Sequence, residues 1–304
     1  MRDSDPQSPM PYTRRRIAID CTAAKLAVAF ALSFVIQSGC TSRTPGSRAS
    51  DSTAAEQLRL SPLRVAGAES PILRDTARRG SDGVVVFVYH SVAKHRLGET
   101  GEQRELDVDT TMFRAQMDLL RRRRCAVVSL SSVVDALREH RPLPAGAVVL
   151  TFDDGWKDQY EEALPILKQY GFTATFFIYT RAIDNGPAFM TWAAVRDLQH
   201  AGMTIGAHSR THPELTRPGV SLVDEIDGAR SDLAHQTGVT PDLFAYPYGS
   251  WNTHVAAAVR AAGFTAARGM ADGRVRPHAD LMALPAVLAT DDIAAYEKAL
   301  DCAQ

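Results

Sequence analysis

Runs of apolar residues alternate with amphipathic segments along most of the chain. Continuous apolar runs, which are typical of strands buried on both faces, lie at 84–89, 126–128, 148–152, 173–179, 203–207, 243–246 and 264–267. Helical spacing of apolar residues predicts helices at 111–120, 131–140, 159–170, 192–201, 222–237 and 254–262. This alternation predicts an α/β fold with a parallel sheet covered on both faces. A closed or nearly closed β/α barrel fits it best. An open doubly wound sheet is the alternative, but no Gly-x-Gly-x-x-Gly turn supports a dinucleotide site.

Polar residues with metal-binding and acid–base chemistry follow two of the predicted strands. Asp153 and Asp154 come directly after the run at 148–152, while His208 and His212 follow the run at 203–207. The carboxyl ends of strands are where α/β barrels build their active sites. Each pair taken alone also suits a solvated turn or structural histidines. Together they favour a metal site with one carboxylate, two imidazoles and a position left for water.

The chain resembles the polysaccharide deacetylase family, the NodB-homology carbohydrate esterases, in its motifs. These are Thr-Phe-Asp-Asp-Gly at 151–155, His-Ser-Arg-Thr-His at 208–212 and Tyr-Pro-Tyr-Gly at 246–249. The resemblance covers residue 83 to the C-terminus. It implies a distorted (β/α) barrel of the NodB-homology type, with about seven parallel strands.

The resemblance also implies a role for each motif residue. Asp154, His208 and His212 are expected to bind a divalent metal, and Asp153 to act as general base. Zinc suits two nitrogen ligands and one oxygen, with nickel or cobalt as alternatives. The backbone N–H of Tyr248, in the third motif, is expected to stabilise the oxyanion.

The chain departs from the family's pattern at two places. Ala245 stands where many members have an arginine that orients the base. Residues 281–287 contain no histidine, although the family's last motif usually supplies the general acid there. The general acid is therefore unassigned. His90 and His278 are candidates, and return of the proton by Asp153 is the favoured route.

The function implied is a metal-dependent hydrolase that removes N-acetyl groups from a β-linked N-acetylglucosamine polysaccharide. Pro247, Tyr248 and Trp192 are expected to contact the sugar, although packing would explain Trp192 equally well. The Ala245 variant and a lipoprotein-like start favour an exopolysaccharide over peptidoglycan or chitin. Two alternatives remain open: an O-acetyl esterase acting on xylan-type glycans, and a non-catalytic carbohydrate-binding or matrix-assembly protein.

The N-terminal region is typical of an export signal. Three arginines at 14–16 precede an apolar stretch at 23–36 and the sequence Ser38-Gly39-Cys40. This end resembles a bacterial lipobox, except at Gln37, where an aliphatic residue is usual. Residues 1–40 are therefore predicted to be a signal peptide, with Cys40 the lipid anchor to a membrane. Residues 41–82 are predicted to be a flexible tether and 83–304 the deacetylase domain, located in the cell envelope and facing the periplasm or exterior.

Composition adds little to this picture. With 34 basic and 35 acidic residues the net charge is −1, so nothing draws the chain toward nucleic acid. The arginine run at 121–124 follows an amphipathic segment and favours a solvated helix end. Cys125 is interpreted as a buried thiol. Export would permit a disulfide with Cys302, which the sequence leaves open.

Overall fold

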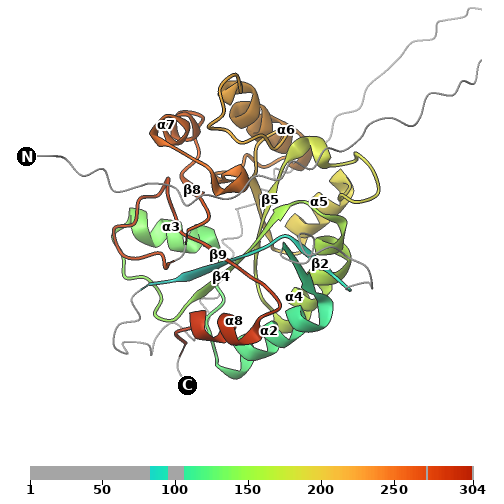
Figure 1. The fold of residues 1–304 in the computed structure, drawn as a ribbon, viewed down its shortest axis with the longest axis vertical. Helices are drawn as coiled ribbons and strands as arrows, with labels where there is room; N and C mark the ends of the chain where they lie inside the picture. Colours follow the sequence, from blue (N-terminus) through green and yellow to red (C-terminus); the bar gives the residue numbers. More distant parts are fainter. Residues whose placement is uncertain (1–82, 95–105, 272, 303–304) are drawn as a thin grey trace, which may run out of the picture. The chain divides into compact units, whose positions relative to one another are not determined.

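The computed structural model of the chain describes residues 83–94, 106–271 and 273–302. Seven parallel strands form one curled sheet with the spatial order β8-β7-β6-β5-β4-β1-β9 (Figure 1). The strands are β1 (Val85–Tyr89), β4 (Val148–Asp154), β5 (Thr175–Ile178), β6 (Thr204–Ala207), β7 (Leu243–Ala245), β8 (Ala266–Arg268) and β9 (Val287–Leu288). The predicted α/β fold with about seven parallel strands is confirmed. Two short parallel strands, β2 (Ser91–Ala93) and β3 (Asp107–Asp109), pair separately.

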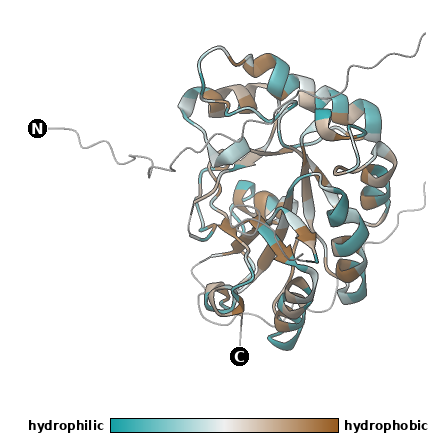
Figure 2. Ribbon diagram, turned by 45° about the vertical axis from the view of Figure 1, so that its right-hand side comes forward, coloured by the Kyte–Doolittle hydropathy of each residue, from teal (hydrophilic) through white to brown (hydrophobic). Residues whose placement is uncertain are grey.

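Helices connect the strands, and all those named here except α3 pack on the outer face of the sheet. They are α2 (Thr110–Arg122), α3 (Leu130–Arg138), α4 (Leu164–Tyr170), α5 (Trp192–His200), α6 (Gly228–Thr237), α7 (Thr253–Ala261) and α8 (Ile293–Ala299). The helices predicted at 159–170 and 222–237 each begin with a π-helical turn, η2 (Gln159–Ala163) and η4 (Val223–Asp227). In Figure 2 the strands are mainly hydrophobic, whereas the surrounding helices carry hydrophilic turns.

The two faces of the sheet belong to two separate apolar clusters, because successive strand residues point to opposite faces. Phe87 and Tyr89 pack in the larger cluster, which includes residues of α2, α4 and α8. Val86 and Val88 pack in the second cluster with Phe177 and one side of α3. The second face is the interior of the curled sheet, and α3 packs against it.

Residues 281–288 span the gap between the sheet's two edges. Leu284 pairs with Arg268 of β8, while Val287 and Leu288 pair with β1. α8 follows this segment and lies beside α2 (Figure 1). The sequence did not predict β9, which has only two residues, or α8. Residues 281–287, where the family's last motif would place a histidine, thus help to close the barrel.

The structure corrects two local predictions and agrees with a third. Residues 126–128 form no strand, because only an isolated bridge joins Val127 to Val148. Cys125 is not a free thiol but is disulfide-bonded to Cys302, with a Cα–Cα distance of 5.0 Å. The arginine run ends α2 on the surface, as predicted, and Arg123 pairs there with Glu297.

The predicted signal peptide at 1–40, the anchor Cys40 and the tether at 41–82 lie outside the described residues. Among the helices of residues 83–94, 106–271 and 273–302, none combines the length and apolar character that a membrane span requires.

Candidate active site

The three predicted ligands meet at the carboxyl ends of β4 and β6. Asp154 Oδ1 lies 3.6 Å from His208 Nε2 and 3.3 Å from His212 Nε2, and the two Nε2 atoms are 3.2 Å apart. Ligand atoms about 2.0–2.2 Å from a tetrahedral zinc would lie about 3.3–3.6 Å from one another. The Asp154 Oδ1 atom is also buried, with no hydrogen-bond partner in the described chain. The donor set and its spacing therefore fit a divalent metal.

A backbone turn at the end of β4 brings two consecutive carboxylates to the same place. In a regular strand Asp153 and Asp154 would point to opposite faces. Asp154 instead adopts a left-handed φ of 77°, and Gly155 follows with φ 86°. As a result Asp153 Oδ2 lies 3.8 Å from His208 Nε2, only slightly farther than Asp154 Oδ1. A β-carbon at Gly155 would stand 3.0 Å from Ile183 Cδ1, so space as well as φ favours glycine.

Two of the predicted ligands are oriented by hydrogen bonds to the side-chain atom that would not bind the metal. His208 Nδ1 donates to the backbone oxygen of Ala245 at 2.8 Å, which leaves the lone pair of Nε2 free. The indole N–H of Trp156 donates to Asp154 Oδ2 at 2.9 Å, which leaves Oδ1 free. Trp156 thus helps to position a predicted metal ligand.

Burial sets the protonation of the three ligands. It lowers the pKa of His208 to about 3 and that of His212 to about 4, so both imidazoles are neutral. Burial also raises the pKa of Asp154 to about 6, and the charge of Asp153 adds to this rise. A bound cation would oppose that rise. Neutral imidazoles and a carboxylate are the forms that bind a divalent metal.

Arg268, the last residue of β8, is the functional residue that the sequence reasoning missed. It is fully buried, and its Nη2 donates a hydrogen bond to Asp153 Oδ1. Burial alone would raise the pKa of Asp153, but the opposing interactions, of which the charge of Arg268 is the largest and to which its hydrogen bond adds, lower it. Asp153 is thus held ionised, as a general base must be.

Arg268 reaches Asp153 because its neighbours are small or flat. Ala245 is its register partner on β7, so both side chains project to the same face, and alanine leaves the space to arginine. The guanidinium stacks 4.9 Å from the ring centroid of Phe177. A β-carbon at Gly206 would stand 2.5 Å from that ring, so glycine is required for the ring to lie there. An arginine directly after the apolar run at 264–267 was the available signal.

The third motif lies at the edge of this group. Tyr248 has a left-handed φ of 59°, follows the buried Pro247, and its ring centroid is 4.7 Å from that of His212. Its side chain is 68% exposed, so it can contact a large substrate. Trp192 begins α5 and lines a separate hollow with Arg181 and His235, apart from the ligand atoms.

The two candidate acids occupy different environments. His90, at the end of β1, has a buried Nδ1 with no hydrogen-bond partner in the described chain. His90 lies close enough to both Asp153 and Asp154 to interact with them electrostatically. His278 is exposed in the loop that precedes residue 281. The geometry therefore favours His90 over His278 as a group that takes part in proton transfer.

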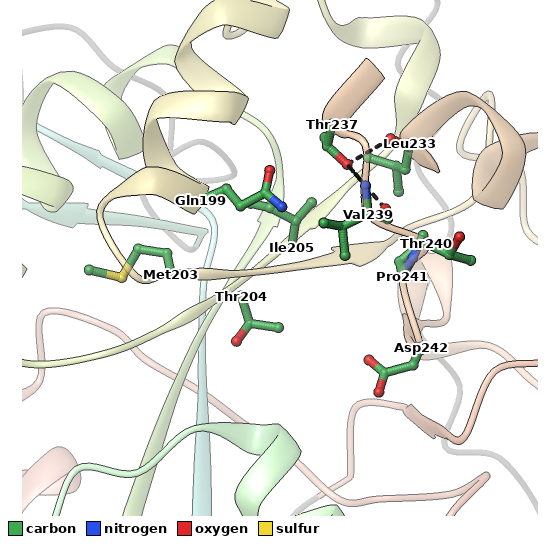
Figure 3. A pocket seen from close by; sticks show the side chains of 10 residues that line it. All are labelled: Gln199, Met203, Thr204, Ile205, Leu233, Thr237, Val239, Thr240, Pro241 and Asp242. Atoms are coloured by element: carbon green, nitrogen blue, oxygen red, sulfur yellow. Dashed lines mark hydrogen bonds between the residues drawn. The ribbon is translucent and has the colours of Figure 1, made fainter. Parts of the chain in front are cut away.

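A cavity of about 140 Å³ lies at the amino ends of the strands, away from the ligand atoms (Figure 3). Its lining includes the start of β6 and the residues just before β7. Asp242 is the one titratable residue in its lining, and the Thr237 hydroxyl is already bonded to Leu233 O and Val239 O. This cavity offers no cluster of ligands or acid–base groups, so it is not the candidate active site.

Residues 140–267 match the family model described as polysaccharide deacetylase. The match confirms the predicted resemblance to this family over these residues. Among relatives it is similar to YxkH of Bacillus subtilis strain 168, whose name describes a polysaccharide deacetylase, with 25% identity over 183 residues, 59% of this chain and 61% of that protein. It is also similar to the poly-beta-1,6-N-acetyl-D-glucosamine N-deacetylase of Escherichia coli strain K12, with 26% identity over 215 residues, 56% of this chain and 31% of that protein.

A solved structure of the same fold is IcaB from Ammonifex degensii. It superposes with a TM-score of 0.63 at 24% identity and covers 72% of this chain and 98% of that chain. The match establishes a shared fold. The chain spans less than two thirds of the length of the two relatives above, so their full activities do not transfer to it directly.

Proposed function

We propose that the protein is a metal-dependent hydrolase that removes N-acetyl groups from a β-linked N-acetylglucosamine polysaccharide. The observation that carries this proposal is the convergence of three ligand atoms, on Asp154, His208 and His212, beside an Asp153 carboxylate paired with Arg268. The combination supplies a cation site and an ionised base within a few ångströms, as metal-assisted amide hydrolysis requires.

A divalent ion, for which zinc is our first choice, would supply Lewis acidity toward the acetyl carbonyl and lower the pKa of water. Asp153 then accepts the proton of the attacking water, and Arg268 keeps this carboxylate ionised and fixed. The backbone N–H of Tyr248 stabilises the developing oxyanion. Cleavage of the C–N bond releases acetate and an amine, which must receive a proton.

Two groups can return that proton, Asp153 and His90. The sequence favoured Asp153, which has just accepted a proton. His90 gains support from its buried, unpartnered Nδ1 and from its electrostatic interaction with both carboxylates. We expect His90→Ala to separate the two routes, with His278→Ala as the matched exposed control. A loss of about a hundredfold or more in kcat, with metal content intact, would assign the proton to His90. Retention of more than about a tenth of wild-type kcat would leave the role to Asp153.

We favour an exopolysaccharide as the substrate because one relative is named as a poly-beta-1,6-N-acetyl-D-glucosamine N-deacetylase. The case for a non-catalytic protein rested on the arginine missing at 245 and the missing last histidine. Arg268 and His90 now offer substitutes for both, which weakens that alternative. An O-acetyl esterase remains the second candidate, since the same chemistry attacks esters.

The test is acetate release from poly-N-acetylglucosamine, chitin oligomers and acetyl-xylan by the zinc-loaded protein, with Asp153→Asn as the inactive control. Release from poly-N-acetylglucosamine above the other two supports the proposal. Faster release from acetyl-xylan would replace it with the esterase. No release from any of the three, with full metal occupancy, would favour a binding protein.

We further propose that the protein is exported and lipid-anchored through Cys40. The disulfide between Cys125 and Cys302 supports export, because such bonds persist in oxidising compartments. Cys40→Ser should move the protein from the membrane to the soluble envelope fraction. An unmodified thiol at Cys40 in the mature protein, detected by mass spectrometry, would rule out the anchor.

A further inference from the structure

Glu225 is a buried carboxylate that holds the loop between the two histidine ligands. It lies in the π-helical turn η4 and is 6% exposed. Its Oε2 accepts hydrogen bonds from the backbone N–H groups of Arg210 at 2.9 Å and Thr211 at 2.8 Å. Its Oε1 accepts from the Thr211 hydroxyl at 2.5 Å. One side chain thus binds three donors of the segment that separates His208 from His212.

This loop needs an anchor because its backbone is strained. Ser209 and His212 both adopt left-handed φ values, 64° and 61°, which cost about 1–3 kcal/mol each for non-glycine residues. The Ser209 hydroxyl accepts from the His212 N–H at 3.0 Å and closes the turn from inside. Glu225 binds the same turn from outside. Together these contacts keep the two Nε2 atoms 3.2 Å apart before any metal arrives.

The negative charge of Glu225 strengthens this contact. A glutamine in its place would offer the two backbone N–H groups a neutral oxygen, which accepts weaker hydrogen bonds, and its N–H₂ group would reverse the bond with the Thr211 hydroxyl. The neighbouring Asp224 is different, because it is exposed and pairs with the side chain of Arg210 through Nη1 at 2.7 Å. It therefore supports the arginine but not the loop backbone.

We propose that Glu225 is a positioning residue of the metal site, which presets His212 for binding a divalent cation. This inference rests on the metal-binding part of the proposed function and not on the substrate. Hydrogen-bond partners beyond the ligands typically change metal affinity by about 10–100-fold. We expect Glu225→Gln to weaken Zn²⁺ binding within that range.

The experiment measures Zn²⁺ affinity by competition with a chromophoric chelator, on the purified full chain without polysaccharide. The visible spectrum of the Co²⁺-substituted protein reports ligand geometry independently of activity. Glu225→Gln should weaken Zn²⁺ binding by about 10–100-fold and alter the Co²⁺ bands. The control Asp224→Asn should stay within about threefold of wild type with an unchanged spectrum, since surface charges contribute little.

A milder variant covers the case in which Glu225→Gln does not fold. Thr211→Val removes only the hydroxyl donor to Glu225 and should still weaken Zn²⁺ binding measurably, by about threefold or more. Wild-type affinity and an unchanged Co²⁺ spectrum in either folded variant would overturn the proposal. Equal weakening in Asp224→Asn would also overturn it, because the effect would then be one of general charge. Since no sugar is used, a failure of the deacetylase assay leaves this result unaffected.

Discussion

Removing the Arg268 guanidinium should destabilise the protein more than removing any surface arginine. The pair that it forms with Asp153 is almost completely buried, with side-chain exposures of 0% and 3%. Breaking a buried ion pair by deleting one partner typically costs about 3–5 kcal/mol, because the remaining charge is left in a low-dielectric interior. Arg268→Met keeps most of the side-chain volume, so it isolates the charge from the cavity effect.

The matched control is the surface pair between Arg260 and Asp280, whose nitrogen–oxygen distance is 3.8 Å and whose side chains are 62% and 61% exposed. Arg260→Met should change the free energy of unfolding by less than about 1 kcal/mol. Both variants are compared with wild type by urea denaturation of the metal-free protein, so that metal binding does not contribute to the measured stability.

Two further measurements identify the cause. The double variant Asp153→Asn/Arg268→Met removes both charges and should be more stable than the sum of the single losses predicts, by about 2–3 kcal/mol. Arg268→Met should also lose about a hundredfold or more in kcat while keeping its metal, because the base is no longer held ionised. The reasoning is refuted if Arg268→Met loses no more stability than Arg260→Met, or if the two changes in the double variant are additive.

Three shorter predictions address the site and its frame. Asp153→Asn should keep the metal and lose about a hundredfold or more in turnover, whereas Asp154→Asn should lose the metal; the opposite result in elemental analysis would exchange the two roles. Cys302→Ser opens the bond to Cys125, which closes a sequence separation of 177 residues. It should lower the free energy of unfolding by about 2–5 kcal/mol in urea titrations, and an unchanged midpoint would contradict this. Removing metal with a chelator should abolish acetate release, and added Zn²⁺ should restore it; undiminished release from verified metal-free protein would contradict the metal-dependent proposal.

Long elements and strand-end residues were predictable because they depend on local patterns. The apolar runs that became β1, β4, β5 and β6 are continuous, and such runs favour a buried parallel sheet. Asp154, His208 and His212 follow two of those runs, and parallel strands bring their carboxyl ends to one edge. The sequence alone therefore determined the fold class and the three residues whose side chains meet at the predicted metal site.

Short elements and contacts between distant strands were not predictable. β9 has only two residues and is held by pairing with β1, and the disulfide joins cysteines 177 residues apart. In the sequence Glu225 has the pattern of an ordinary surface residue of a helix. Only the fold places η4 against residues 209–211, between the two histidine ligands.

Arg268 shows most clearly what the tertiary structure decided. From the sequence, Ala245 indicated that the base had lost its orienting arginine. Only the register of β7 on β8 shows that Arg268 is the direct partner of Ala245, with its guanidinium directed at Asp153. The apolar pattern of a strand that is buried on both faces does not distinguish those faces, so its register depends on how residues far apart in the chain pack together. The sequence determined which chemical groups the site contains, whereas the tertiary structure decided which strand delivers the charge that holds the base.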